Sequence, residues 1–128
     1  MCAKILVVDD EEALVLGLRQ ALILEFPGNQ VDAAYSGEEA LSLLADASYD
    51  LIIADYRMPG FSGLDLIKGV RYLDGYVPII LITGYGSDEV RGEAQKLGVN
   101  YYVEKPFDVE DLLGKAGLLL PDQGLAGG

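Results

Sequence analysis

Histidine is absent from the 128-residue sequence. Histidine supplies the ligands of many zinc sites and the general base of Ser-His-Asp triads, so both kinds of site are excluded within this chain. A phosphohistidine cannot form here either. Any phosphohistidine chemistry would therefore need a second protein.

Cysteine is nearly absent as well, since Cys2 is the single one. One cysteine excludes a disulfide scaffold and indicates a reducing compartment. No apolar run approaches the ~18 residues of a membrane helix. Two acids follow the opening apolar stretch directly, which argues against a signal peptide. We expect a cytoplasmic protein without a membrane segment.

Basic residues are scarce: 9 lysines and arginines face 21 acidic residues, for a net charge of −12. Direct binding to nucleic acid or to a membrane surface is not expected, because phosphate contacts need a basic surface. Acids that converge in the fold would instead favour a hard cation.

The length and the 51% hydrophobic content predict one domain with a real core. We expect this domain to cover residues 1–120. The last segment, 121–128, reads PDQGLAGG and is expected to be a flexible tail or the start of a linker.

Short apolar runs alternate with longer amphipathic segments along the chain. The expected strands cover 4–8, 30–34, 51–54, 78–82 and 101–103, and the expected helices 11–26, 36–47, 62–73, 87–97 and 108–119. Five such units predict a doubly wound α/β domain with a parallel sheet covered on both faces. We expect the flavodoxin-like strand order 2-1-3-4-5, because the weakest strand, 30–34, then lies at an edge.

Ligands of such sheets bind beyond the carboxyl ends of the strands. The residues at these ends are Asp9 and Asp10, Asp55, Thr83, and Lys105. Each of them alone could be an ordinary surface or turn residue. At four strand ends of one sheet they predict a common site.

The chemistry of this set points to phosphoryl transfer. Three neighbouring carboxylates repel one another unless a cation intervenes, and magnesium takes carboxylates, water and phosphate as ligands. Lys105 adds a second positive charge and Thr83 a hydroxyl donor. Asp55 stands alone on the central strand and faces both, so we expect it to be the nucleophile that accepts phosphorus.

Four segments, KILVVDDE, LIIADYRMPGFSG, IILITG and YYVEKPF, occur in this order on the predicted strand ends. Together they resemble the receiver domain of two-component response regulators, over residues 4 to about 119. No single segment is decisive, since VVDD alone is common. Their combination is specific.

The resemblance implies roles for individual residues. Asp55 is expected to be the phosphoacceptor and, with Asp10, a direct magnesium ligand, while Asp9 acts through water and Arg57 through its backbone carbonyl. Thr83 corresponds to the switch hydroxyl that moves to the phosphoryl group, and Lys105 to the lysine that pairs with it. The Lys105-Pro106 bond is often cis in this family. Tyr102 corresponds to the aromatic residue whose rotamer reports phosphorylation.

The resemblance also implies partners. The phosphoryl donor would be a sensor histidine kinase or a histidine phosphotransfer protein, and the output partner is open. A homodimer through the face of residues 87–119 is a further expectation. The domain would assist its own phosphorylation and dephosphorylation, and would not be an enzyme that turns over a metabolite.

Three other functions stay open at this point. A haloacid-dehalogenase-type phosphatase also uses an aspartate after a parallel strand, but it needs an acid two residues later, where this chain has Arg57. A receiver that is no longer phosphorylated, and serves only as an interaction module, would lack one of the site residues. A flavodoxin would have a phosphate-binding loop where this chain has Asp9 and Asp10.

The residue pattern of the first predicted helix indicates a docking surface. On a helical wheel, the core stripe is Leu14, Leu18, Ala21 and Leu22. Leu16 and Ile23 fall on the opposite arc, and exposed apolar pairs of this spacing can mark a contact with a partner. Scattered surface hydrophobic residues are the alternative. In the family, this helix meets the histidine kinase.

Overall fold

The computed structural model describes residues 3–57, 62–84 and 88–121. Five strands alternate with five helices within these residues. The strands are β1 (Lys4–Val8), β2 (Gln30–Ala34), β3 (Leu51–Asp55), β4 (Ile79–Thr83) and β5 (Tyr101–Glu104). The helices are α1 (Glu12–Glu25), α2 (Gly37–Asp46), α3 (Gly63–Leu73), α4 (Asp88–Lys96) and α5 (Val109–Leu119).

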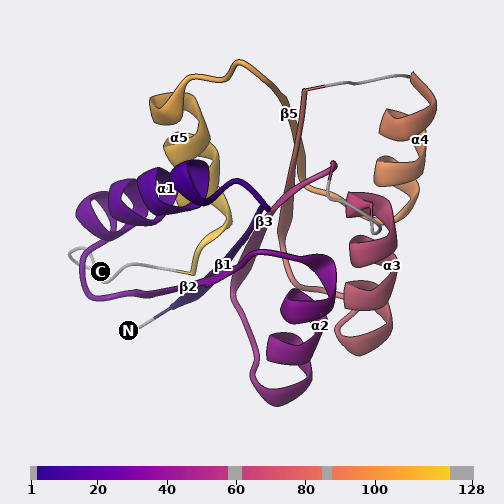
Figure 1. The fold of residues 1–128 in the computed structure, drawn as a ribbon, viewed down its shortest axis with the longest axis horizontal. Helices are drawn as coiled ribbons and strands as arrows, with labels where there is room; N and C mark the ends of the chain where they lie inside the picture. The colour runs from indigo at the N-terminus through magenta and orange to yellow at the C-terminus, as the bar shows by residue number, and fades with distance from the viewer. Residues whose placement is uncertain (1–2, 58–61, 85–87, 122–128) are drawn as a thin grey trace.

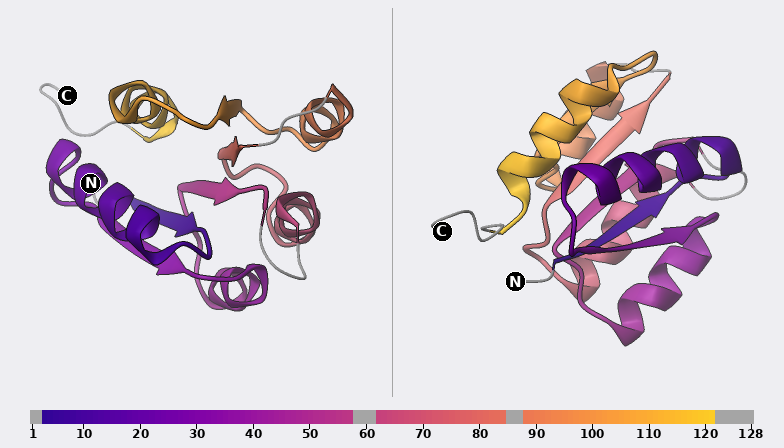
Figure 2. Two further views of the ribbon diagram at one scale, coloured as in Figure 1. Left: turned by 45° about the horizontal axis from the view of Figure 1, so that its top comes forward. Right: turned by 90° about the vertical axis from the view of Figure 1, so that its left-hand side faces the viewer.

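The strands form one parallel sheet in the order β2-β1-β3-β4-β5, which confirms the predicted order. Helices α1 and α5 cover one face of the sheet, and α2, α3 and α4 cover the other (Figure 1). The layering is also visible in Figure 2, where the sheet runs between the two groups of helices. Two separate apolar clusters fill the layers, because successive strand residues point to opposite faces.

Strand burial explains why these segments pair where they do. Every residue of β3 and β4 is buried, as continuous apolar runs in the middle of a parallel sheet require. β2 is only partly buried and lies at an edge, as its weaker pattern predicts.

Caps fix the helices at the ends that face the candidate site. The Ser62 side chain accepts a hydrogen bond from the Asp65 backbone N–H, and the Asp65 side chain accepts one from the Ser62 N–H, which completes a capping box. Asp108 caps α5 through the Glu110 N–H. Ser36 caps α2, but the Glu39 carboxylate accepts its bond from Tyr35 instead of from the cap residue.

Several boundaries differ from the prediction by one or two residues. Asp55 and Thr83 are the last residues of their strands and not loop residues, so the sheet itself holds both. The predicted start of the fourth helix, Ser87, lies outside the described residues, as do the residues 122–128 of the predicted tail. Leu120 is 7% exposed and still packs in the core.

The buried residues of α1 differ in part from those that the helical wheel predicts. Leu18 and Leu22 are buried as expected, but the third buried residue is Val15, while Leu14 and Ala21 are only partly buried. The helix is therefore rotated so that Val15 faces the sheet and Leu14 lies at the rim, where it packs on the same cluster. Among the described helices, none is long and apolar enough to cross a membrane.

Candidate functional site

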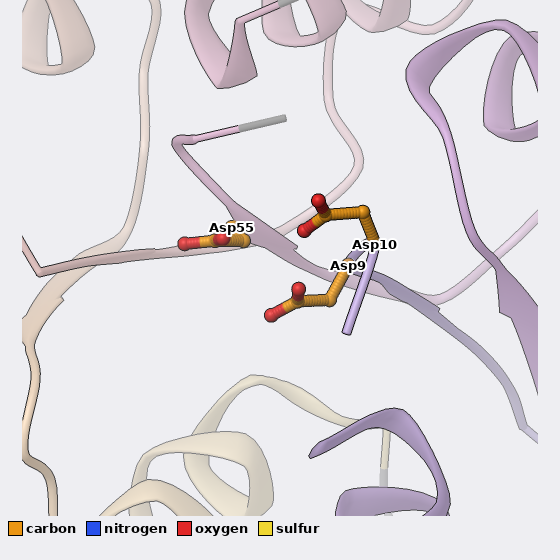
Figure 3. Close-up of side chains that lie close together, drawn as sticks. All are labelled: Asp9, Asp10 and Asp55. Carbon is orange, nitrogen blue, oxygen red and sulfur yellow. The ribbon is translucent and has the colours of Figure 1, made fainter. Parts of the chain in front are cut away.

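Three carboxylates converge at the carboxyl edge of the sheet. Asp9 and Asp10 directly follow β1, and Asp55 ends β3. One oxygen of each carboxylate lies within 4.8 Å of the others, and Figure 3 shows the three side chains close together, two from the end of β1 and one from the end of β3. Asp9 and Asp55 are buried, at 2% and 4% exposure, whereas Asp10 is exposed. The cluster thus has a buried floor and an open rim.

Backbone bonds hold Asp9 in place. Its N–H donates to the Ala34 carbonyl at 3.1 Å, which prolongs the pairing of β1 with β2. Its Oδ1 accepts the Glu11 N–H at 2.9 Å, in a local turn that leads into α1. The second oxygen, Oδ2, is buried and accepts no hydrogen bond from the described residues.

Asp55 is positioned by the end of β3. The next residue, Tyr56, donates its N–H to the Ile82 carbonyl at 2.7 Å and accepts the Gly63 N–H at 2.6 Å. A hydrogen bond from the Arg57 backbone reaches the Asp55 carboxylate. Asp55 Oδ1 is buried and, like Asp9 Oδ2, accepts no hydrogen bond of good geometry from the described residues.

Lys105 supplies the positive charge of the cluster. Its Nζ lies 3.5 Å from Asp55 Oδ1 and 3.8 Å from Asp9 Oδ2. Its backbone N–H donates to the carbonyl of Thr83 at 2.7 Å, which brings the ends of β4 and β5 together. Thr83 is fully buried. The Lys105-Pro106 peptide bond is cis, as the resemblance implies.

Burial dominates the electrostatics of the site. It raises the pKa of Asp55, against the lowering effect of Lys105 and of the Arg57 backbone hydrogen bond, while the Asp10 charge raises this pKa further. Burial also raises the pKa of Asp9 to about 6; the Glu11 backbone bond lowers it and the Asp55 charge raises it. One ammonium therefore does not balance three carboxylates, and a further cation would stabilise their charged forms.

The structure brings together five of the residues expected at the site: Asp9, Asp10, Asp55, Thr83 and Lys105. Their chemical roles remain predictions, as does the part of the Arg57 carbonyl. The Arg57 side chain is exposed. Tyr102 is half-buried and packs on the α4 side of the sheet, and its hydroxyl is buried.

Leu16 and Ile23 lie on the outer face of α1 and do not line the acid cluster. They are 55% and 41% exposed, and Leu24 beside them is 72% exposed. With Arg19 and Gln20, these three side chains border a shallow groove. Their exposure was predicted, and their contact with a partner remains a prediction.

Three residues around the site were missed in the sequence. Gly63 packs against the end of β3 so closely that a Cβ would lie 2.6 Å from Tyr56 Cα. Arg91 of α4 contacts both Tyr102 and Glu104 of β5. Alternation along β5 places Glu104 on the opposite face from Lys105, where it meets Arg91. The partner on α4 could not be identified without the orientation of that helix.

Comparison with known proteins identifies the family. The model of the response regulator receiver domain matches residues 5–116. The transcriptional regulatory protein YkoG of Bacillus subtilis, itself uncharacterized, is 36% identical over 120 residues, which are 94% of this chain and 52% of YkoG. The chain thus spans about half the length of this curated relative.

Solved structures agree with the sequence match. The chemotaxis protein CheY4 of Vibrio cholerae has a TM-score of 0.83 and 32% identity, over 94% of this chain and 100% of that one. The response regulator TrrA of Thermotoga maritima, in complex with Mg²⁺-BeF, has a TM-score of 0.80 and 37% identity, over 92% and 99% of the two chains. The matched region contains all the strand ends that build the acid cluster, and the chain belongs to the response regulator receiver domain family of two-component systems.

Proposed function

We propose that this receiver domain accepts a phosphoryl group on the carboxylate of Asp55 and passes the event on as a conformational change. The observation that carries this proposal is the ion pair of Lys105 with Asp55 inside a cluster of three carboxylates. A nucleophile, a cation and a buried hydroxyl at one sheet edge are the parts that phosphoryl transfer needs.

Magnesium fits the residues present. Two buried carboxylate oxygens, Asp9 Oδ2 and Asp55 Oδ1, accept no hydrogen bond of good geometry from the described residues and share only the Lys105 ammonium, and Asp10 adds a third, exposed carboxylate. An all-oxygen, acidic donor set with an open side suits a hard cation that keeps some water. Asp10 and Asp55 would bind the ion directly, Asp9 through water, and Arg57 through its carbonyl. When bound, the ion supplies positive charge to the oxygens of the phosphoryl group.

Asp55, Lys105 and Thr83 each have a separate role in the proposed phosphoryl transfer. An oxygen of Asp55 attacks phosphorus, the bond between phosphorus and the donor histidine nitrogen breaks, and the nitrogen keeps the electron pair. The Lys105 ammonium, 3.5 Å from Asp55, neutralises charge on the transferred group. Thr83 donates its hydroxyl to a phosphoryl oxygen. Hydrolysis of the acyl phosphate at the same site would reset the domain.

Phosphorylation adds a charge of about −1.5 to −2 and new acceptor oxygens. We propose that Thr83 moves toward them, that the Tyr102 side chain fills the space that Thr83 vacates, and that α4 shifts in response. Among the described residues of α4 only Ala94 is fully buried, so few apolar contacts oppose such a shift.

This chain has no histidine of its own, so a phosphohistidine donor has to be another protein. We propose that it is a cytoplasmic sensor histidine kinase or histidine phosphotransfer protein. We propose that the exposed Leu16 and Ile23 side chains contribute to its docking surface. We also propose that the domain forms a homodimer through the face of residues 87–119. The role is that of a signalling module over about residues 1–120, with 121–128 as a tail or linker.

The direct test uses acetyl phosphate as a small acyl phosphate donor. The protein is incubated with acetyl phosphate and Mg²⁺, and its intact mass is measured. We expect one added phosphoryl group in the unsubstituted protein and in Asp46→Asn, a control at an exposed acid at the end of α2. We expect none in Asp55→Asn. A wild-type mass without the phosphoryl group, or an equal gain in Asp55→Asn, would refute the proposal.

A further inference from the structure

The side of β5 that faces α4 presents two side chains to that helix. In the sheet register, Tyr102 pairs with Leu81 and Glu104 pairs with Thr83. Residues paired in a parallel sheet, and residues two apart on a strand, share a face. Tyr102 belongs to the apolar cluster that includes Ala94 of α4, so this shared face is the α4 side. Thr83 therefore lies on the same face as Tyr102.

Arg91 of α4 contacts both of these β5 side chains. Its guanidinium carbon lies 4.8 Å from the centroid of the Tyr102 ring, in cation–π geometry. Its Nη2 lies 3.8 Å from Glu104 Oε1, with both side chains about half exposed. A pair this open contributes little stability, but it directs the guanidinium over the ring.

The Tyr102 hydroxyl is buried although its ring is only partly covered. Burial raises the pKa of this hydroxyl, whereas the Arg91 charge and the nearby Thr83 side chain lower it, although the hydroxyl makes no hydrogen bond of good geometry with the described residues. The hydroxyl thus lies beside Thr83, and Arg91 covers the outer side of the ring. The three groups form a row from the surface of α4 to the hydroxyl at the end of β4.

We propose that Arg91, oriented by Glu104, is a positioning residue that keeps the Tyr102 hydroxyl buried beside Thr83. This inference rests on the proposed function in one respect: its consequence is that Arg91 favours the arrangement in which Thr83 serves a phosphoryl group on Asp55. Arg91 touches neither Asp55 nor Lys105 in any described contact, and acts through Tyr102.

The two ends of α4 are held by different contacts, and this is why the contact between Arg91 and Tyr102 matters. The carboxyl end of α4 is held from α3, because Arg71 donates to the carbonyls of Leu97 at 2.6 Å and Gly98 at 3.0 Å. Toward the other end, Val90 is only partly buried and Arg91 bridges the helix to β5. The ring of Tyr102 is thus coupled to the less firmly packed half of α4.

The test follows Tyr102 directly. The protein is labelled with 3-fluorotyrosine, its ¹⁹F NMR signals are recorded in H₂O and D₂O, and Tyr102→Phe assigns the signal. We expect Arg91→Ala to increase the solvent isotope shift of Tyr102, which reports exposure. Arg91→Lys, which retains a cation, should restore part of the burial. Lys96→Ala, at an exposed lysine of the same helix, should leave the signal unchanged.

A second measurement separates this inference from the proposed function. With acetyl phosphate and Mg²⁺, we expect Arg91→Ala to be phosphorylated about two- to fivefold more slowly, the factor that a partly exposed cation–π contact provides. Glu104→Gln retains Arg91 but removes the charge that orients it, and should change both readouts in the same direction by less than Arg91→Ala. An unaltered Tyr102 signal in Arg91→Ala would overturn the positioning role, even if phosphorylation proceeds normally. Absence of phosphorylation in the wild type would instead refute the proposed function, and the ¹⁹F result would still stand.

Discussion

Lys105 is the residue whose two expected effects have opposite signs. Its ammonium lies 3.5 Å from Asp55 Oδ1 and 3.8 Å from Asp9 Oδ2, so it partly neutralises the same carboxylates that would bind Mg²⁺. The ammonium repels the metal ion, yet it stabilises the transferred phosphoryl group. Binding and transfer should therefore respond differently when it is removed.

We predict that Lys105→Gln binds Mg²⁺ about fivefold more tightly, or ~1 kcal/mol after solvent screening at a partly exposed side chain. The same substitution should slow phosphorylation by acetyl phosphate about a hundredfold, because a charge that stabilises the transition state is lost. Calorimetric titration and mass spectrometry measure the two quantities. Lys115→Gln, which breaks a surface pair with Asp111, is the control and should change neither. Weaker Mg²⁺ binding by Lys105→Gln would contradict this electrostatic account.

The meeting of Asp9, Asp10, Asp55, Thr83 and Lys105 could be predicted from the sequence. Each follows or ends a strand of the sheet, and parallel strands bring their carboxyl ends to one edge of the sheet. The contact of Arg91 with Tyr102 could not be predicted, because it depends on the rotation of α4 about its axis. α4 has a single buried residue to fix that rotation, so its apolar pattern is a weak guide.

At the scale of elements, the approach of α3 to β3 depends on a missing side chain. A Cβ on Gly63 would lie 2.6 Å from Tyr56 Cα and 2.9 Å from the Asp55 carbonyl oxygen. Both atoms belong to the backbone that holds the proposed phosphoacceptor, so neither can move without moving the site. The first residue of α3 must therefore be glycine for the helix to start this close to the strand.

We predict that Gly63→Ala lowers the free energy of unfolding by about 1–3 kcal/mol, the usual range for overpacking. It should also slow phosphorylation of Asp55, because the end of β3 has to shift. Urea denaturation and the acetyl phosphate assay measure the two effects. Gly17→Ala provides a control of opposite sign: nothing lies within 4 Å of its Cβ position on α1, so it should stabilise by about 0.5–1 kcal/mol. Equal effects of the two substitutions would show that the close approach at Gly63 is not decisive.

Element boundaries show where sequence patterns lose precision. The wheel of α1 places Leu14 in the core stripe, yet Val15 is buried and Leu14 is only partly so. Both residues are apolar, and a rotation of the helix by a fraction of a turn exchanges them. α5 covers the same face of the sheet as α1 and occupies part of that space. The sequence of α1 alone contains no information about this neighbouring helix.

On the scale of the whole molecule, the acid cluster opposes folding. The chain has a net charge of −12, and two of the three clustered carboxylates are buried. Bringing them together costs free energy through desolvation and mutual repulsion, which the raised pKa of Asp9, about 6, also reflects. A cation that binds only the folded chain would offset this cost by mass action.

We predict that Mg²⁺ raises the thermal stability of the protein well beyond the effect of NaCl at equal ionic strength. At a hundredfold excess over its dissociation constant, a ligand of the folded state adds about 2.7 kcal/mol, which corresponds to several degrees in Tm for a domain of this size. Screening by salt acts on all exposed charges and cannot distinguish this cluster.

Asp10→Asn provides the decisive comparison, since Asp10 is the exposed acid of the three. Without Mg²⁺ this variant should be more stable than the wild type, by ~1 kcal/mol, because one repelling charge is gone. With Mg²⁺ it should gain much less than the wild type. If Asp10→Asn gained as much from Mg²⁺ as the wild type, the ion would be binding elsewhere on the acidic surface and not between Asp9, Asp10 and Asp55.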